Sequence, residues 1–194
     1  MCNFSTMSRT ELIHELIALP DPVILSDASA AYLASQRARM SPASDALVCR
    51  KLAAARELLL RDLTDQMQAK PILGSPDMVR EWLRLHCAHL EYEVFIVLCL
   101  DVRNRLIEAE QLFRGTLTQT SVYPREVVKS ALARNAASIM VAHNHPSGNP
   151  EPSAADCTLT QQIKSVLALV EVRVLDHFIV AGDSILSFAE QGLL

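Results

Sequence analysis

The chain has 194 residues, half of them hydrophobic, and its 18 basic and 22 acidic side chains leave a formal net charge of −4. This length can bury a core without disulfides, and the charge gives no global indication of a nucleic-acid or membrane surface. The five cysteines form no C-x-x-C motif, so we expect reduced thiols in a cytoplasmic protein. We identify neither a signal peptide nor the run of about 20 apolar residues that a membrane helix needs.

The first 70 residues are predicted to be a helical extension, and none of them is a glycine. Helices are expected over residues 9–19 and 46–69, where leucine and alanine recur at helical spacing in the second segment. Residues 27–37 could form a third helix. The stretch Ser41–Ser44 contains a proline and predicts a loop.

From residue 71 onward, strands are predicted to alternate with helices. Ser75 and Pro76 are typical of a helix start, with Ser75 as its cap. Residues 93–100 form a largely apolar run that predicts a central strand buried on both faces. The other expected elements are a helix to residue 89, a hairpin strand over 105–113, a short strand or loop over 115–122, a helix over 124–136, a strand over 138–142, a helix over 154–169, a strand over 172–180 and a short last strand. Residues 71–194 therefore form an α/β or α+β core.

One segment of this core carries a candidate metal site. His143 and His145 alternate along an extended chain, so both imidazoles can point to one place, with Cα atoms about 6.5–7 Å apart. The following loop contains three prolines and a glycine and returns the chain to Asp156, in the first turn of the next helix. Two neutral imidazoles and one carboxylate form a ligand set for a tetrahedral ion whose fourth position stays open, as in catalytic zinc sites.

The same residues also allow a purely structural interpretation. Ser153 and Asp156 have the spacing of a helix capping box, and the two histidines could be ordinary hydrogen-bonding side chains of a loop. With six histidines in the chain, an H-x-H pair is expected by chance about 0.2 times, and a fixed later aspartate lowers this to about 0.01. The spacing therefore favours the metal site.

The complete pattern, H-x-H followed after ten residues by Asp, with Ser three positions before the Asp, resembles the JAMM or MPN-plus motif of zinc hydrolases. Within that family, the sequence resembles the RadC branch most. Further segments carry the resemblance: Phe113–Thr116, Tyr123–Glu126, Leu175–His177 and Phe188–Gly192. It covers residues 73–194 and implies a cytidine-deaminase-like α/β fold with a mixed sheet flanked by helices. It also implies a zinc ion held by His143, His145 and Asp156.

The resemblance further implies hydrolysis of an amide or isopeptide bond, as in a metallopeptidase, by water that zinc activates. The general base would be a glutamate that opens the first strand, which matches Glu93, and Ser153 would stabilise the oxyanion. Glu91 lies two residues earlier and would point the same way along a strand. We favour Glu93 because it enters the buried sheet, whereas Glu91 follows a helix end and is expected to be solvated. The peptide or isopeptide substrate is unknown.

A role in DNA repair or nucleic-acid binding is the alternative that the family's naming implies. Fuller RadC chains carry helix-hairpin-helix elements whose hairpins use glycine, and this chain has no glycine before Gly74. We therefore expect no tight DNA binding by its N-terminal region. The net charge favours solvated or ion-paired arginines over a basic face. The arginines that such a face would use are Arg103, Arg105, Arg114, Arg125 and Arg134.

Other metal sites fit the sequence less well. His89 and Glu91 have the H-x-E spacing of deaminases without the P-C-x-x-C partner. His14 begins an H-E-x-x-H pattern whose second histidine is absent. His86, Cys87 and His89 could form a cluster at a helix end, which would supply too few converging ligands.

Three other residues are expected to be structural. Cys157 is predicted to be a small buried residue that points away from Asp156. His177, in an apolar strand, is expected to be a core histidine with satisfied hydrogen bonds. Asp176 is expected to be the partner of His177 or to orient a ligand histidine.

Overall fold

The computed structural model of this chain describes residues 4–18, 42–115 and 122–194, and for residues 42–45 it describes the backbone alone. By their contacts, the residues divide into two compact units, Met1–Asp62 and Leu63–Leu194. The expected third helix over 27–37 and nearly all of the expected strand or loop over 115–122 lie outside the described residues. Within the described ranges, no helix is long and apolar enough to cross a membrane.

The first unit contains the 3₁₀ turn η1 (Phe4–Thr6), helix α1 (Arg9–Ile17) and most of helix α3 (Pro42–Ala69). The end of α1 is fixed by Lys51, whose Nζ donates to the backbone oxygens of Leu16 and Ala18, at 2.7 Å each. A cation at this position also complements the negative end of the helix dipole. The helices predicted over residues 9–19 and 46–69 are thus confirmed.

The start of α3 corrects one expectation. The loop predicted over Ser41–Ser44 is wrong from Pro42 onward, because Pro42 is the first residue of the helix. Proline is tolerated in the first helical turn, where its missing N–H has no helical partner in any case.

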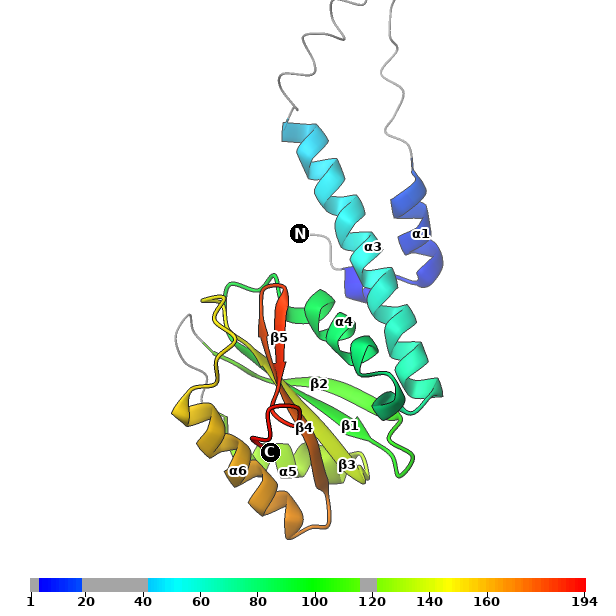
Figure 1. The fold of residues 1–194 in the computed structure, drawn as a ribbon. Coiled ribbons are helices and arrows are strands. Elements are labelled where there is room, and N and C mark those ends of the chain that lie inside the picture. The colour runs from blue at the N-terminus through cyan, green and yellow to red at the C-terminus, as the bar shows by residue number, and fades with distance from the viewer. Residues whose placement is uncertain (1–3, 19–41, 116–121) are drawn as a thin grey trace, which may run out of the picture. The chain divides into compact units, whose positions relative to one another are not determined.

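The second unit is built on one mixed sheet of five strands in the order β2-β1-β3-β4-β5 (Figure 1). Neighbouring strands are antiparallel except β3 and β4, which run parallel. The strands are β1 (Val94–Leu100), β2 (Leu106–Arg114), β3 (Ser138–Asn144), β4 (Arg173–Ala181) and β5 (Ser184–Ser187), and the other elements are η2 (Ile72–Gly74), α4 (Pro76–Cys87), α5 (Pro124–Ala133) and α6 (Ala154–Ala168). This confirms the predicted mixed α/β fold and the predicted hairpin of β1 with β2.

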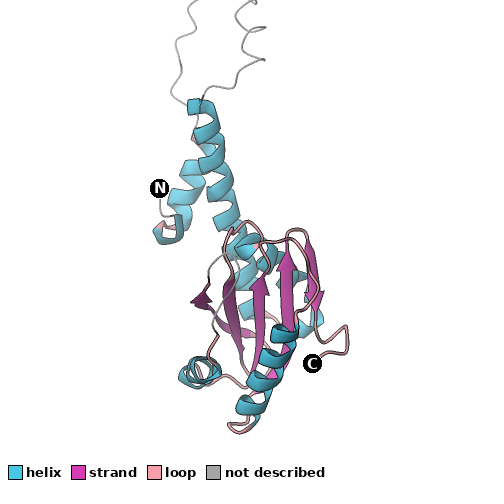
Figure 2. Cartoon of the chain, turned by 90° about the vertical axis from the view of Figure 1, so that its left-hand side faces the viewer, coloured by secondary structure: helices cyan, strands magenta, loops and turns pink. Residues whose placement is uncertain are grey.

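Helices cover both faces of the sheet, with α5 and α6 on one face and α4 on the other (Figures 1 and 2). All residues of β1 and β3 are buried, as expected for strands that are covered twice. Side chains alternate between the faces. Val97, Ile139 and Val141 therefore join the core under α5 and α6, together with Ile163 and Leu167 of α6.

The start of α4 differs in detail from the prediction. Ser75 occupies the cap position and Pro76 the first turn, but the side chain of Ser75 makes no capping hydrogen bond. The 3₁₀ turn η2 ends immediately before it, and Ser75 donates its backbone N–H to the oxygen of Ile72. Its backbone conformation therefore differs from that of a usual N-cap.

Candidate metal centre

The two histidines of the motif lie at the end of the central strand β3, and Asp156 is the third residue of α6. His143 is still paired within the sheet, with Phe95 on one side and Ile179 on the other. The chain turns after His145, where Gly148 has a positive φ of 78° and donates its N–H to the oxygen of His145. Glycine adopts this conformation without strain.

The loop brings the three expected ligands together. His143 Nε2 lies 2.9 Å from His145 Nε2 and 3.3 Å from Asp156 Oδ1, and His145 Nε2 lies 3.6 Å from Asp156 Oδ2. Around a tetrahedral zinc ion with bonds of about 2.0–2.1 Å, ligand atoms are about 3.3 Å apart. The observed separations bracket this value. Among the described residues, these three form the one group of His, Cys, Asp or Glu whose ligand atoms converge in this way.

The groups around His145 make the site suitable for a cation. Its Nδ1 lies 2.8 Å from the backbone oxygen of Asn149, which can only accept a hydrogen bond, so Nδ1 carries the proton. In the neutral imidazole the lone pair is then on Nε2, which faces His143 and Asp156. Contact with Asp156 raises the pKa of His145 above its ordinary value, although burial opposes this. A positive charge at this point is therefore favoured.

Asp156 and Ser153 also form the capping box that the structural interpretation predicted. Ser153 Oγ accepts from the Asp156 N–H at 3.1 Å and donates to Asp156 Oδ2 at 2.6 Å, while the Ser153 N–H donates to Oδ2 at 2.8 Å. Burial alone would raise the pKa of Asp156, but its contacts with the imidazoles of His143 and His145 hold that pKa well below its ordinary value. The cap and the ligand cluster therefore use the same carboxylate.

The two candidate bases differ in their surroundings. Glu93 directly precedes β1 and is half-buried, whereas Glu91 is exposed in a bend. Continuing the register of β1 and β3 by two residues beyond the Phe95 and His143 pair places Glu93 opposite His145. The negative charge of Glu93 contributes to the raised pKa of His145. The structure thus places Glu93 where its charge acts on His145.

Sequence reasoning missed the connection between the site and Thr160. His177 is a fully buried core histidine, as predicted, but it contacts His143, with His143 Nδ1 and His177 Nε2 2.8 Å apart. The other nitrogen, His177 Nδ1, lies 2.7 Å from Thr160 Oγ1. Burial lowers the pKa of His177 well below its ordinary value, so the ring is neutral. The spacing of four residues between Asp156 and Thr160 places them on one face of a helix and could have indicated this link.

The expectation for Asp176 is wrong in part. Its carboxylate does not contact the ring of His177; it accepts the backbone N–H groups of His177 and Ala189 and the hydroxyl of Ser187. The reason is strand alternation, which sends neighbouring side chains of β4 to opposite faces of the sheet. Asp176 instead joins β4 to the segment after β5.

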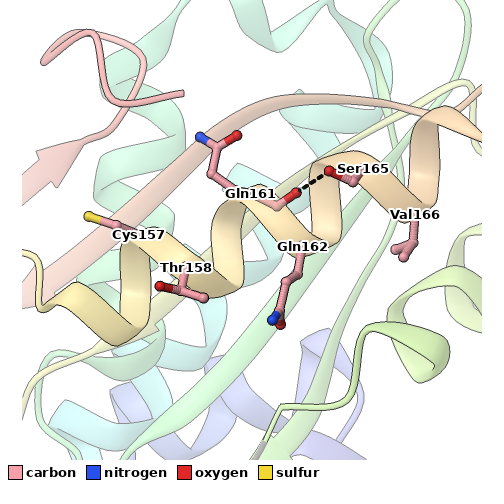
Figure 3. Close-up of a pocket in the computed structure, with 6 residues that line it drawn as sticks. All are labelled: Cys157, Thr158, Gln161, Gln162, Ser165 and Val166. Atoms are coloured by element: carbon pink, nitrogen blue, oxygen red, sulfur yellow. Dashed lines mark hydrogen bonds between the residues drawn. The ribbon is translucent and has the colours of Figure 1, made fainter.

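The prediction that Cys157 is buried is wrong. It is partly exposed and lies at one end of a shallow cavity of about 580 Å³ on the outer side of α6 (Figure 3). The cavity has no charged side chain in its lining. The lining residues are Cys157, Thr158, Gln161, Gln162, Ser165 and Val166.

The rival metal cluster near the end of α4 does not form among the described residues. The ring of His86 stacks on Trp82 with centroids 4.5 Å apart. The thiol of Cys87 is buried and donates to the backbone oxygen of Leu83 at 3.2 Å. These two side chains therefore serve the packing of α4.

Most of the arginines considered for a nucleic-acid face have partners. Arg114 lies over the ring of Tyr92, 3.8 Å from its centroid. Three others form ion pairs: Arg105 with Asp101, Arg125 with Glu126, and Arg134 with Glu108 and Glu110. The expectation of ion-paired arginines is thus met at these three positions.

Comparison with known proteins identifies relatives of this chain. The sequence model of the RadC-like JAB domain matches residues 73–193. A UPF0758 protein of Herminiimonas arsenicoxydans is 58% identical over 144 residues, which are 74% of this chain and 64% of that protein. A UPF0758 protein of Aromatoleum aromaticum is 62% identical over 145 residues, again 74% of this chain and 64% of the relative. The matched part therefore spans less than two thirds of the length of these relatives.

Proposed function

This chain belongs to the RadC-like JAB domain family, and on that premise we propose that it is a zinc-dependent hydrolase of amide or isopeptide bonds. The observation that carries the proposal is the convergence of His143 Nε2, His145 Nε2 and an Asp156 carboxylate oxygen, at separations that suit a tetrahedral ion. We assign the activity to residues 71–194, with residues 1–70 as a helical extension. The free cysteines fit a cytoplasmic protein.

The zinc ion, Glu93 and Ser153 would each have a separate role in hydrolysis. A zinc ion at the three ligands would act as a Lewis acid and make water nucleophilic at neutral pH. Glu93 would accept the proton of the attacking water and return it to the leaving amine. Ser153 would stabilise the developing oxyanion with its hydroxyl, whose proton in this structure is directed to Asp156 Oδ2.

The uncharged cavity on α6 and the ion-paired arginines favour a polypeptide substrate over a nucleic acid. The cavity lies on the outer side of α6 and is lined by uncharged side chains, among them Gln161 and Gln162, which can hydrogen-bond to peptide groups. A phosphate backbone would instead require unpaired basic side chains. Arg105, Arg125 and Arg134 are engaged by carboxylates.

Hydrolysis in isotopically labelled water tests the proposal. Zinc-loaded protein would be incubated in H₂¹⁸O with a proteome-derived peptide library and with lysine-linked isopeptides, and the products would be identified by mass spectrometry. We expect new amines, and new carboxylates that carry one ¹⁸O atom from the water, formed by the wild type and not by Glu93→Gln or after chelation of zinc. Absence of such products from zinc-loaded wild type, or equal products from Glu93→Gln, would contradict the proposal.

A further inference from the structure

His143 contacts a histidine outside the motif, His177, whose ring is completely buried. It belongs to β4, where the register pairs it with Val141 of β3. Its ring stacks on Phe188, with centroids 4.6 Å apart, and meets Phe95 edge-on at 6.0 Å. This packing fixes the plane of the imidazole, so each of its two nitrogens has one fixed partner.

These partners form a continuous chain of hydrogen bonds. His143 Nδ1 lies 2.8 Å from His177 Nε2, and His177 Nδ1 lies 2.7 Å from Thr160 Oγ1. Thr160 Oγ1 in turn lies 2.6 Å from the backbone oxygen of Asp156. The chain therefore links the imidazole of one expected ligand to the backbone of another, through two residues that are 0% and 1% exposed.

The direction of every bond in this chain follows from its last acceptor. A carbonyl oxygen can only accept, so Thr160 donates its single hydroxyl proton to Asp156 O. Thr160 Oγ1 must then accept the proton of His177 Nδ1. A buried imidazole without a counter-charge is neutral and carries one proton, so His177 Nε2 is an acceptor. His143 therefore carries a proton on Nδ1, and in the neutral ring its lone pair is on Nε2.

We propose that Thr160 and His177 are positioning residues that hold His143 in the Nε2-lone-pair tautomer, ready to bind a metal ion before the ion arrives. The purpose of this arrangement rests on the proposed function, because Nε2 is the atom that faces His145 and Asp156. Hydrogen bonds of this kind to the second nitrogen set the tautomer and orientation of ligand histidines. His145 needs one such bond, to Asn149, whereas His143 depends on three in series.

The same helix supplies a matched control. Thr158 makes an equivalent hydroxyl bond to a carbonyl four residues earlier, with Thr158 Oγ1 2.8 Å from Ala154 O. It lies on the exposed side of α6, where it lines the shallow cavity with Cys157 and Gln162 (Figure 3). Thr158→Val therefore removes a hydrogen bond of the same kind as Thr160→Val does, and it leaves the hydrogen bonds of His143 and His177 unchanged.

The tautomer can be observed without metal and without activity. Long-range ¹H–¹⁵N spectra of the full chain, freed of metal and held near pH 8, distinguish protonation at Nδ1 from protonation at Nε2. We expect His143 to be protonated at Nδ1 in the wild type, in Thr158→Val and in the conservative variant Thr160→Ser. In Thr160→Val, His177 loses its acceptor and can reverse its tautomer, so His143 should become a mixture. An unchanged pattern in Thr160→Val would overturn the proposal.

Zinc affinity supplies the second readout. Competition with a chromophoric chelator should give a dissociation constant about 10–100-fold weaker for Thr160→Val than for the wild type. Thr160→Ser and Thr158→Val should stay close to the wild type. His177→Phe keeps a ring between Phe95 and Phe188 and breaks the chain at another link, so it should weaken zinc binding similarly. Equal affinity in the folded variants overturns the proposal, whereas a wild type that binds no zinc contradicts the proposed function and leaves the tautomer result standing.

Discussion

The side-chain oxygen of Asn144, the residue between the two motif histidines, accepts a hydrogen bond from the backbone N–H of Val94 at 2.8 Å. The amide nitrogen of Asn144 donates to the backbone oxygen of Tyr92 at 3.0 Å. These two contacts lie on either side of Glu93, so a single buried amide ties the backbone of the candidate base to the strand that carries the ligands. Both bonds require one orientation of the amide, because an N–H must meet its oxygen and a carbonyl its nitrogen.

Asn144→Ala should therefore separate catalysis from metal binding. Without the amide, the backbone around Glu93 loses both contacts, and displacement of a catalytic group by about 1 Å can reduce turnover about 100-fold. We expect turnover to fall by roughly 10–100-fold while zinc content stays at the wild-type level, as measured by elemental analysis alongside the peptide assay. Ser138→Ala removes a buried hydroxyl at the other end of β3, where it bonds to Asn104 at 3.3 Å, and serves as the control. If Ser138→Ala lost turnover and Asn144→Ala did not, the proposed role of Asn144 would be contradicted.

Removal of one imidazole should abolish stable metal binding. We predict one zinc ion per wild-type chain and a sharp loss of zinc in His145→Ala, because two remaining ligands leave an open, weak site. Elemental analysis after dialysis gives the stoichiometry. His89→Ala, at an exposed histidine outside the cluster, should keep the full zinc content. Equal zinc in His145→Ala and the wild type would place the metal elsewhere.

Glu93→Gln and Glu91→Gln should differ in turnover. Glutamine keeps the shape of Glu93 but cannot accept a proton as a base, so we expect Glu93→Gln to keep zinc and fold and to lose hydrolysis. Glu91 is exposed, and Glu91→Gln should change turnover little, since exposed substitutions away from special features have small effects. Turnover and zinc content are measured on both proteins. The opposite pattern of activities would assign the base to Glu91.

Burial should decide which cysteines react with alkylating reagents. Burial raises the pKa of the Cys87 thiol to about 12, and the reactive thiolate is therefore about one part in ten thousand at pH 8. Cys49 is exposed on α3. Peptide mapping after iodoacetamide treatment at pH 8 should find Cys49 modified and Cys87 unmodified until the chain is unfolded. Similar rates at both sites in the folded protein would contradict the buried position of Cys87.

The sequence predicts what depends on local pattern and fails where an outcome depends on contacts between distant segments. The apolar run ending at Leu100 predicts a doubly covered strand, and the spacing from His143 to Asp156 predicts their convergence, because both follow from strand geometry and loop length. The link from His143 through His177 to Thr160 needs the parallel pairing of β3 and β4 and the position of α6. No local sequence motif indicates this pairing or this position.

Asp176 allows a pH-dependent test of the core behind β4. Burial raises the pKa of its carboxyl above the ordinary value, although hydrogen bonds from Ser187 and from the backbone of Ala189 and His177 oppose the shift. A folded pKa above the unfolded one means that the folded chain binds the proton more tightly. The stability that Asp176 contributes is therefore fully present below the ordinary pKa of 3.8 and is lost as the pH rises through the raised value.

Asp176→Asn should consequently gain stability relative to the wild type between pH 4 and pH 7. The asparagine oxygen can still accept the N–H groups of His177 and Ala189, and its nitrogen can donate to Ser187 Oγ. Asp176→Ala leaves those backbone donors buried without an acceptor and should lower the free energy of unfolding by roughly 2–4 kcal/mol. Urea unfolding followed by circular dichroism, with chelator present at both pH values, measures all three proteins. A difference between wild type and Asp176→Asn that is independent of pH would show that the carboxyl is ionised as easily in the folded chain as in the unfolded one.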